Sequence, residues 1–211
     1  MNHCPTLSTP PVRATARRGF FFRFMACALG LALLAALAQQ SALAAPNVLY
    51  SKDGLSFEHP AGWKVTEDSV AQDETRLRSI DLEGPDDAVV TFNISPYLQG
   101  QNIEGFAATI AKSRGESEKS DGAIAQQLRY SPATTAPITR TVAGRENKGV
   151  SQRFVISLLG QKLPHEARFF KANLGGTTAI VMTQVAEEYA KATESGFALV
   201  LGTLRYGADK R

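Results

Sequence analysis

The chain has 211 residues, of which 44% are hydrophobic and 20% charged, and its formal net charge is +3. Residues 1–44 hold four of the 23 basic residues, no acidic residue, and both cysteines, Cys4 and Cys27. Residues 45–211 are therefore free of cysteine and carry 19 basic against 20 acidic residues. This composition excludes a basic nucleic-acid binder, a disulfide scaffold and a cysteine-ligated zinc or iron–sulfur protein.

Residues 1–44 have the three parts of a secretory signal peptide. A basic stretch precedes an apolar run at 26–38, and Ala42-Leu43-Ala44 then places small residues at both cleavage-recognition positions. An apolar run of this length is short for a hydrocarbon core of ~30 Å. We therefore predict cleavage after Ala44 and a single periplasmic domain over 45–211, with an uncleaved membrane anchor as the alternative.

Two further features of this segment concern export. Arg17-Arg18, followed by Gly19-Phe20-Phe21, resembles a twin-arginine signal, so both the twin-arginine and the general secretory route stay open. Cys27 lies at the start of the apolar run instead of after it, which excludes lipidation at that cysteine. The alanine- and arginine-rich composition is typical of a Gram-negative bacterium. Contact with the membrane is expected only transiently, during export.

Hydrophobic periodicity predicts an α+β fold with an antiparallel sheet of about six strands flanked by helices. Alternating apolar residues predict strands over 55–57, 63–65, 88–95, 150–159, 163–172 and 177–185. Helical spacing predicts helices over 103–111 and 186–205, and 115–137 is predicted to be a loop. The pair Phe169-Phe170 puts bulk on both faces of its strand, which indicates helices on one face and at least partly on the other.

The opening phrase 54–63, GLSFEHPAGW, resembles the SFxYPxGW motif of the PsbP-like and DcrB-like families, with His59 in place of the usual tyrosine. After Val142-Ala143-Gly144 the predicted elements are a hairpin, a strand and a closing helix. This order is similar to that in the C-terminal half of these families. The resemblance implies an α/β/α sandwich that serves as a non-enzymatic binding platform, as in photosystem assembly proteins, a Ran-binding factor and secretion chaperones. It also implies that Trp63 anchors the core beneath a helix.

Residues 45–211 offer little that catalysis could use. His59 and His165 are the only imidazoles, and no Gly-x-Ser-x-Gly motif occurs. Residues 144–149 have the glycine spacing of a phosphate-binding loop, but Val150 stands where its lysine must be, so we predict a hairpin or loop. Asp86-Asp87 supplies too few oxygens for Ca²⁺. We predict no catalytic residue, no metal site and no cofactor; a hydrolase with scattered carboxylates is the alternative.

Four residues are candidates for contact with a partner: His59, Arg153, Glu166 and Arg168. If Gly160-Gln161 is a two-residue turn, facing positions have numbers that sum to 321, and Arg153 lies opposite Arg168. Two guanidinium groups could then hold a carboxylate or another anion, or Glu166 could neutralise them.

These observations predict a binding module whose partner is an envelope protein or a small ligand. A carrier of a hydrophobic ligand is a further alternative, and that function needs a continuous apolar cavity of several hundred Å³. His59, next to Pro60 and near Trp63, is expected to be an exposed turn residue, or alternatively a ligand contact.

Overall fold

A computed structural model describes residues 46–117 and 128–207, which belong to one compact unit spanning 45–211. The predicted signal peptide and the cleavage position after Ala44 lie outside the described residues. Within the described ranges, no helix is long and apolar enough to span a membrane.

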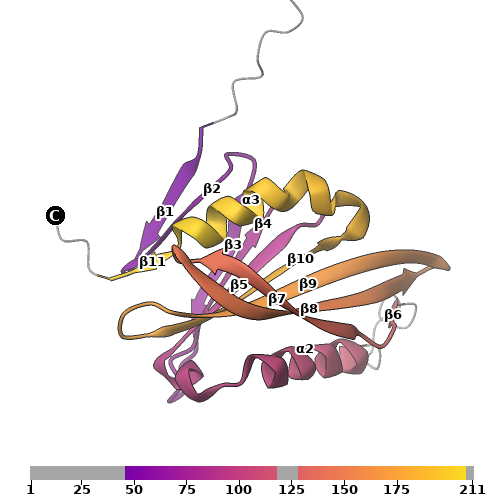
Figure 1. Cartoon of the computed structure of the whole chain (residues 1–211), viewed down its shortest axis with the longest axis horizontal. Coiled ribbons are helices and arrows are strands. Elements are labelled where there is room, and N and C mark those ends of the chain that lie inside the picture. The colour runs from indigo at the N-terminus through magenta and orange to yellow at the C-terminus, as the bar shows by residue number, and fades with distance from the viewer. Residues whose placement is uncertain (1–45, 118–127, 208–211) are drawn as a thin grey trace, which may run out of the picture. The chain divides into compact units, whose positions relative to one another are not determined.

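An eight-stranded antiparallel sheet forms the centre of the fold (Figure 1). Its order is β3-β4-β5-β10-β9-β8, and β6 and β7 both pair with the outer side of β8. The bounds are β3 (Lys64–Val70), β4 (Arg78–Glu83), β5 (Val89–Ile94), β6 (Leu128–Tyr130), β7 (Thr134–Val142), β8 (Arg145–Leu158), β9 (Gln161–Asn173) and β10 (Thr178–Ala186). The α+β class and the antiparallel pairing are confirmed. The expected count of about six strands is too low: β4, β6 and β7 were not predicted, and the predicted strand at 55–57 belongs to a separate sheet.

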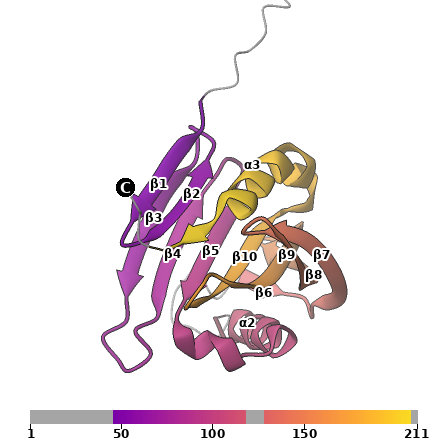
Figure 2. The same cartoon turned by 60° about the vertical axis from the view of Figure 1, so that its left-hand side comes forward.

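A second sheet of three short strands lies beside the main one (Figure 2). It consists of β1 (Val48–Lys52), β2 (Leu55–His59) and β11 (Arg205–Tyr206), with β2 in the middle. Strand β2 was expected from its alternation, and its alternate residues Leu55 and Phe57 are fully buried. The Phe57 ring stacks on Phe92 of β5 with centroids 4.8 Å apart, which joins the two sheets.

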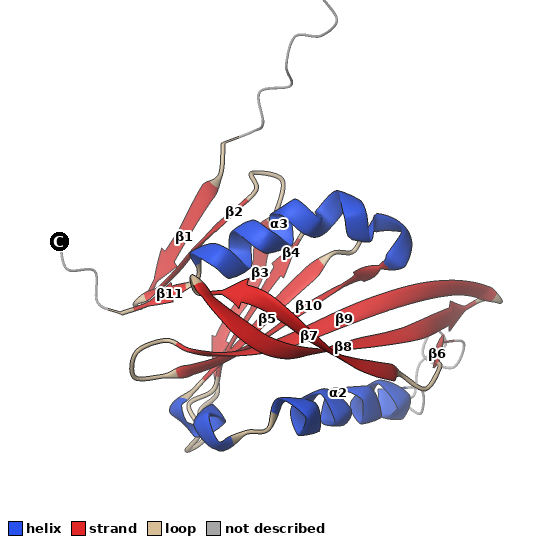
Figure 3. Ribbon diagram, in the orientation of Figure 1, coloured by secondary structure: helices blue, strands red, loops and turns tan. Residues whose placement is uncertain are grey.

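Two helices cover opposite faces of the main sheet (Figure 3). Helix α3 (Ala190–Thr203), preceded by the 3₁₀ turn η3 (Glu187–Tyr189), lies with the small sheet over one face. Helix α2 (Ile103–Ser117), preceded by the 3₁₀ turn η1 (Pro96–Gly100), covers β8 and β9 on the other face. Both helices were predicted from their apolar spacing, and α2 extends beyond its predicted end at residue 111.

Trp63 is buried beneath α3, as expected, with 6% of its surface exposed. Its ring meets the Phe197 ring edge-on at 5.3 Å between centroids. A Cβ atom at Gly84 would lie 2.7 Å from the indole, and one at Gly196 of α3 would lie 2.4 Å from it. The indole therefore occupies a slot that exists because two positions lack a side chain.

The β8–β9 hairpin differs from the predicted register. Its turn is Leu159-Gly160, with φ of 53° and 80°, and facing residue numbers sum to 319. Positive φ at both positions is the type I′ geometry that suits the twist of the strands. Arg153 therefore lies opposite Glu166 instead of Arg168, which replaces a repulsive pair by an attractive one.

Two further facing pairs in this hairpin also differ from the prediction. Phe154 faces His165 instead of Ala167, and Ile156 faces Leu163 instead of His165. Because partners shift by two positions, every side chain keeps the face that was predicted for it.

Candidate binding groove

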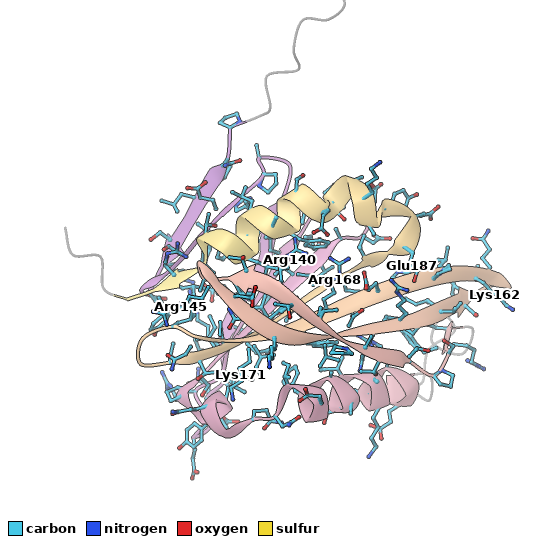
Figure 4. All side chains as sticks on the ribbon, viewed as in Figure 1. Arg140, Arg145, Lys162, Arg168, Lys171 and Glu187 are labelled. Atoms are coloured by element: carbon cyan, nitrogen blue, oxygen red, sulfur yellow. The ribbon has the colours of Figure 1, made fainter. Side chains whose placement is uncertain are left out.

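An open groove of about 530 Å³ lies between α3 and the strands that face it. One wall is the helix, one wall is the edge strand β7, and side chains of β9 form the floor. The lining residues are Ile138, Thr139, Arg140, Thr141, Glu166, Arg168, Phe170, Glu194, Ala198 and Gly202. Figure 4 places Arg140 and Arg168 together beneath α3.

A chain of ion pairs crosses this groove. Glu194 of α3 accepts hydrogen bonds from Arg140 of β7 at 2.6 Å and from Arg168 of β9 at 2.8 Å. The Arg168 guanidinium also donates to Glu166 at 2.7 and 2.9 Å, and the Ser151 hydroxyl of β8 donates to Glu166 at 2.7 Å. Three strands and one helix are thus connected through two acidic side chains, two basic side chains and the Ser151 hydroxyl.

The charges of this network hold one another in the ionised state. Burial opposes ionisation of Glu166 and Glu194, but hydrogen bonds from Arg168 and Ser151 together outweigh it at Glu166. At Glu194, hydrogen bonds from Arg140 and Arg168 do the same. The pKa of each carboxyl is therefore lower than usual, and the pKa of Arg168 is raised despite burial, because both carboxylates bind it. Arg168 is already engaged, so it does not present a vacant anion site.

Arg153 lies at the end of the same network. Its side chain is 69% exposed, and its Nε atom lies 3.8 Å from Glu166 and 3.7 Å from Glu187. The structure thus brings three of the four candidate residues together, although Arg153 and Arg168 do not form the predicted facing pair.

His59 is not part of this group. It is buried at the end of β2, with 6% exposure, so the expectation of an exposed turn residue is wrong. Its Nδ1 atom lies 2.9 Å from the Pro60 carbonyl oxygen, to which the protonated nitrogen can donate. Burial follows from the strand alternation that also buries Leu55 and Phe57, and this packing explains His59 without a ligand.

The backbone of β7 gives the groove a second property. The turn Ala143-Gly144, with φ of 52° and 73°, joins Val142 and Arg145, which form the first hydrogen-bonded pair of the ladder. Because such pairs alternate along antiparallel strands, the N–H and C=O groups of Thr139 and Thr141 point away from β8. Pro137 falls at the same kind of position, where proline's missing N–H removes no ladder bond.

This outer edge of β7 is open. Among the residues described by the structure, no strand pairs with it. The sequence analysis did not predict this edge strand, because Pro137 and the neighbouring small polar residues are typical of a loop. The alternation of Ile138, Arg140 and Val142 with threonines is the signal that could have revealed it.

The described residues offer no alternative centre for metal or phosphate chemistry. Across 46–117 and 128–207, no three His, Cys, Asp or Glu side chains gather as metal ligands. Asp86 and Asp87 form a turn with φ of 55° and 57°. Residues 144–149 form part of a hairpin, as predicted, and Gly149 leaves room for the Phe170 ring, which a Cβ atom there would meet at 2.5 Å.

The chain matches no protein-family model, and no curated protein matches its sequence. Several solved structures are similar. A PsbP protein of the cyanobacterium Synechocystis, CyanoP, has a TM-score of 0.47 and 13% identity, over 80% of this chain and 96% of its own. A protein of Bacteroides thetaiotaomicron has a TM-score of 0.40 and 12% identity, over 80% of this chain and 51% of its own.

A third similar structure is LpqN of Mycobacterium tuberculosis, a protein involved in cell envelope biogenesis. It has a TM-score of 0.37 and 10% identity, over 76% of this chain and 88% of its own. At these identities and TM-scores the matches assign neither a function nor a partner. A PsbP protein is nevertheless among the solved structures to which this chain is similar, as the motif at 54–63 predicted.

Proposed function

We propose that the chain is exported to the periplasm and acts there as a non-enzymatic binding module, with an extended segment of a partner protein as its ligand. The segment adds as a strand to the open edge of β7 and lies in the groove beside α3. The observation that supports this proposal best is the pair of outward-facing backbone groups at Thr139 and Thr141, both of which line the groove.

Strand β3, at the opposite edge of the main sheet, is less suited to strand addition. Strand β3 has a register shift between Val65 and Glu67, and a bulge disturbs the regular spacing that an added strand needs. On β7, residues 138–142 keep regular pairing with β8 on the inner side. The Arg140–Glu194–Arg168 network would supply side-chain contacts of both charge signs to the partner segment.

The rival function as a carrier of hydrophobic ligands is less favoured. The groove of about 530 Å³ is large enough, but four of its ten lining residues are charged. A carrier of this kind needs a lining that is mainly apolar.

Photo-crosslinking in the native periplasm tests the proposal. A photoreactive amino acid at Thr139 or Thr141 should give a covalent adduct with a partner protein. The same amino acid at Thr66, an exposed position on β3, is the matched control and should give none. Adducts of equal yield from all three positions would indicate non-specific contact and contradict the proposal.

A proline substitution tests whether the backbone edge is what binds. Thr139→Pro removes an outward N–H without removing a ladder bond, so the adduct from Thr141 should disappear while the melting temperature changes little. Thr135→Pro changes an equivalent position outside the groove and should leave the adduct intact. Persistence of the adduct in a folded Thr139→Pro variant would refute strand addition.

The absence of catalysis is tested separately. The purified mature protein should show no turnover of generic ester, phosphate, peptide or glycan substrates. Turnover that a single carboxylate substitution abolishes would establish the hydrolase alternative instead.

A further inference from the structure

A second, smaller cavity lies on the opposite face of the sheet, between the C-terminal part of α2 and strands β6 and β8. Its volume is about 260 Å³, and none of its lining residues is acidic. The lining consists of Ala111, Lys112, Arg114, Tyr130, Ser131, Pro132, Ala133 and Phe154. The pocket is therefore of mixed polarity: four of its eight lining residues are alanine, proline or phenylalanine, and two are cationic.

The guanidinium of Arg114 is held firmly in the wall of this pocket. It donates to the amide oxygens of Gln152 at 3.0 Å and Gln184 at 3.3 Å, and its central carbon lies 4.2 Å from the centre of the Phe154 ring. Gln152 is itself 2% exposed, and its amide nitrogen donates to the Ala107 carbonyl of α2 at 2.9 Å. This second bond fixes the orientation of the amide, so its oxygen faces the guanidinium.

All of these contacts are neutral. In the described part of the chain, no carboxylate lies within ion-pair distance of Arg114, whereas the buried Arg78 and half-buried Arg168 each bind one. Burial lowers the pKa of Arg114, because desolvation of its charge outweighs the opposing coulombic effect of Tyr130. Arg114 is half-buried, and a charge partly removed from water is ordinarily paired, since desolvating it alone is costly.

The guanidinium keeps donors for such an anion. Arginine has five N–H groups, of which Gln152 and Gln184 account for two. A planar carboxylate matches the paired N–H groups of arginine. The pocket volume of about 260 Å³ is slightly below the usual range of ~300–1,000 Å³ for ligand pockets, which favours a small molecule or a chain terminus.

We propose that this pocket binds a carboxylate ligand with a small apolar or aromatic body. Arg114 holds the carboxylate, Lys112 at the rim adds positive charge, and Phe154 and Pro132 contact the apolar part. A free organic acid and the C-terminal carboxylate of a peptide share this chemistry. The site does not depend on the β7 groove, which lies on the other face of the sheet.

Benzoate is a suitable probe, with benzamide as its neutral counterpart. In a two-dimensional NMR titration of the mature protein, benzoate should shift the amide signals of the pocket residues at millimolar concentration, and benzamide should not. A pentapeptide ending in phenylalanine, with either a free or an amidated C-terminus, distinguishes the two sources. The proposal is supported if either carboxylate probe binds saturably and its neutral counterpart does not bind. The probe that binds then shows whether the ligand is a free organic acid or a peptide C-terminus.

Arg114→Met should weaken benzoate binding about 10- to 100-fold, the loss expected for a charge-assisted hydrogen bond. Arg129→Met, at an exposed position on β6 outside the pocket lining, is the control and should bind as the parent does. Arg114→Lys keeps the charge and loses the planar fork, so it should bind more weakly than the parent. It also serves as the folded variant if Arg114→Met is unstable.

Three results would overturn the proposal. The first is no saturable binding of any carboxylate probe, and the second is equal binding of benzoate and benzamide. The third is tighter benzoate binding by the double variant Glu118→Gln/Asp121→Asn than by the parent protein. This variant lacks both acidic side chains of 118–127. That result would mean that the chain provides its own counter-ion for Arg114.

Discussion

The Trp63 indole depends on the absence of side chains at Gly84 and Gly196. Gly196→Ala should destabilise the domain by about 1–3 kcal/mol, because the new Cβ atom overpacks the slot. Gly202→Ala, in the same helix, has nothing within 4 Å of the added atom and should be neutral or stabilising by up to ~1 kcal/mol. Urea unfolding of the two variants measures the difference, and equal effects would contradict this account.

Removal of the indole itself should have a larger effect. Trp63→Ala takes away a side chain that is 6% exposed and in contact with α3, so we expect a loss of about 3–5 kcal/mol of unfolding free energy. A melting temperature within one or two degrees of the parent would show that the site is not part of the core.

Asp68 joins the small sheet to the edge of the main sheet. It accepts hydrogen bonds from Arg78 at 2.8 and 3.0 Å, from the Tyr50 hydroxyl at 2.8 Å and from Lys52 at 2.5 Å. Asp68→Asn should cost about 3 kcal/mol, because it leaves the buried Arg78 without its charge partner. Asp53→Asn, which changes an exposed carboxylate 3.9 Å from the same arginine, should cost at most about 0.5 kcal/mol.

The contribution of Asp68 to the free energy of unfolding should depend on pH. The Arg78 hydrogen bonds, with those of Lys52 and Tyr50, outweigh burial and hold the pKa of Asp68 well below its usual range. The stabilisation is therefore complete above the unfolded-state pKa of about 3.9 and is lost as the pH falls toward the folded-state value. The stability difference between parent and Asp68→Asn should shrink in urea titrations from pH 5 to pH 2.5; a constant difference would contradict the assignment.

At the scale of elements, the helices and the strands with an apolar alternation were predictable, and the others were not. In β4 the inward positions are Arg78, Ile80 and Leu82, so a buried charge interrupts the apolar pattern. In β1, most side chains are exposed, which leaves no alternation to detect. These strands are specified by partners that lie elsewhere in the sequence, such as Asp68 for Arg78.

The charged residues of the groove were likewise only partly predictable from the sequence. Arg153, Glu166 and Arg168 could be assigned to one face from the period of two within a hairpin. Arg140 and Glu194 could not be added, because no strand was predicted over 138–142, where Arg140 lies, and Glu194 belongs to a distant helix. The sequence therefore predicted part of the charge network, without the two residues that connect it to β7 and α3.

The β8–β9 turn allows a paired test of register. Leu159 has φ of 53°, which asparagine tolerates better than leucine, so Leu159→Asn should stabilise the domain by about 0.5–1 kcal/mol. Gln161 lies in β9, so Gln161→Asn should not stabilise. The opposite outcome, measured by thermal unfolding, would favour the register with Gly160-Gln161 as the turn.

At the scale of the whole molecule, the two faces of the sheet have separate roles in our proposals. The face beneath α3 holds the charged groove, and the face beneath α2 holds the Arg114 pocket. Occupation of either site should therefore leave the affinity of the other unchanged to within about two-fold. Titration with benzoate in the presence and absence of the captured partner tests this independence.

Export remains a prediction from residues 1–44. We expect the periplasmic form to begin at Ala45, because Ala42-Leu43-Ala44 alone combines small residues at both recognition positions with a preceding polar break. N-terminal sequencing of the periplasmic protein checks this. A different first residue, or a full-length chain retained in the membrane, would contradict it.

The central strand of the small sheet has a consequence for folding kinetics. Strand β2 pairs with β1 on one side and with β11 on the other. The Glu58 N–H donates at 2.8 Å to the hydroxyl of Thr203, which lies 145 positions later in the sequence. Closing so long a loop costs entropy before its contacts compensate, which slows folding. We therefore expect Leu55 and Phe57 to lack part of their final cover in a chain that has been synthesised only as far as residue 202, and exposed apolar surface of this kind favours aggregation.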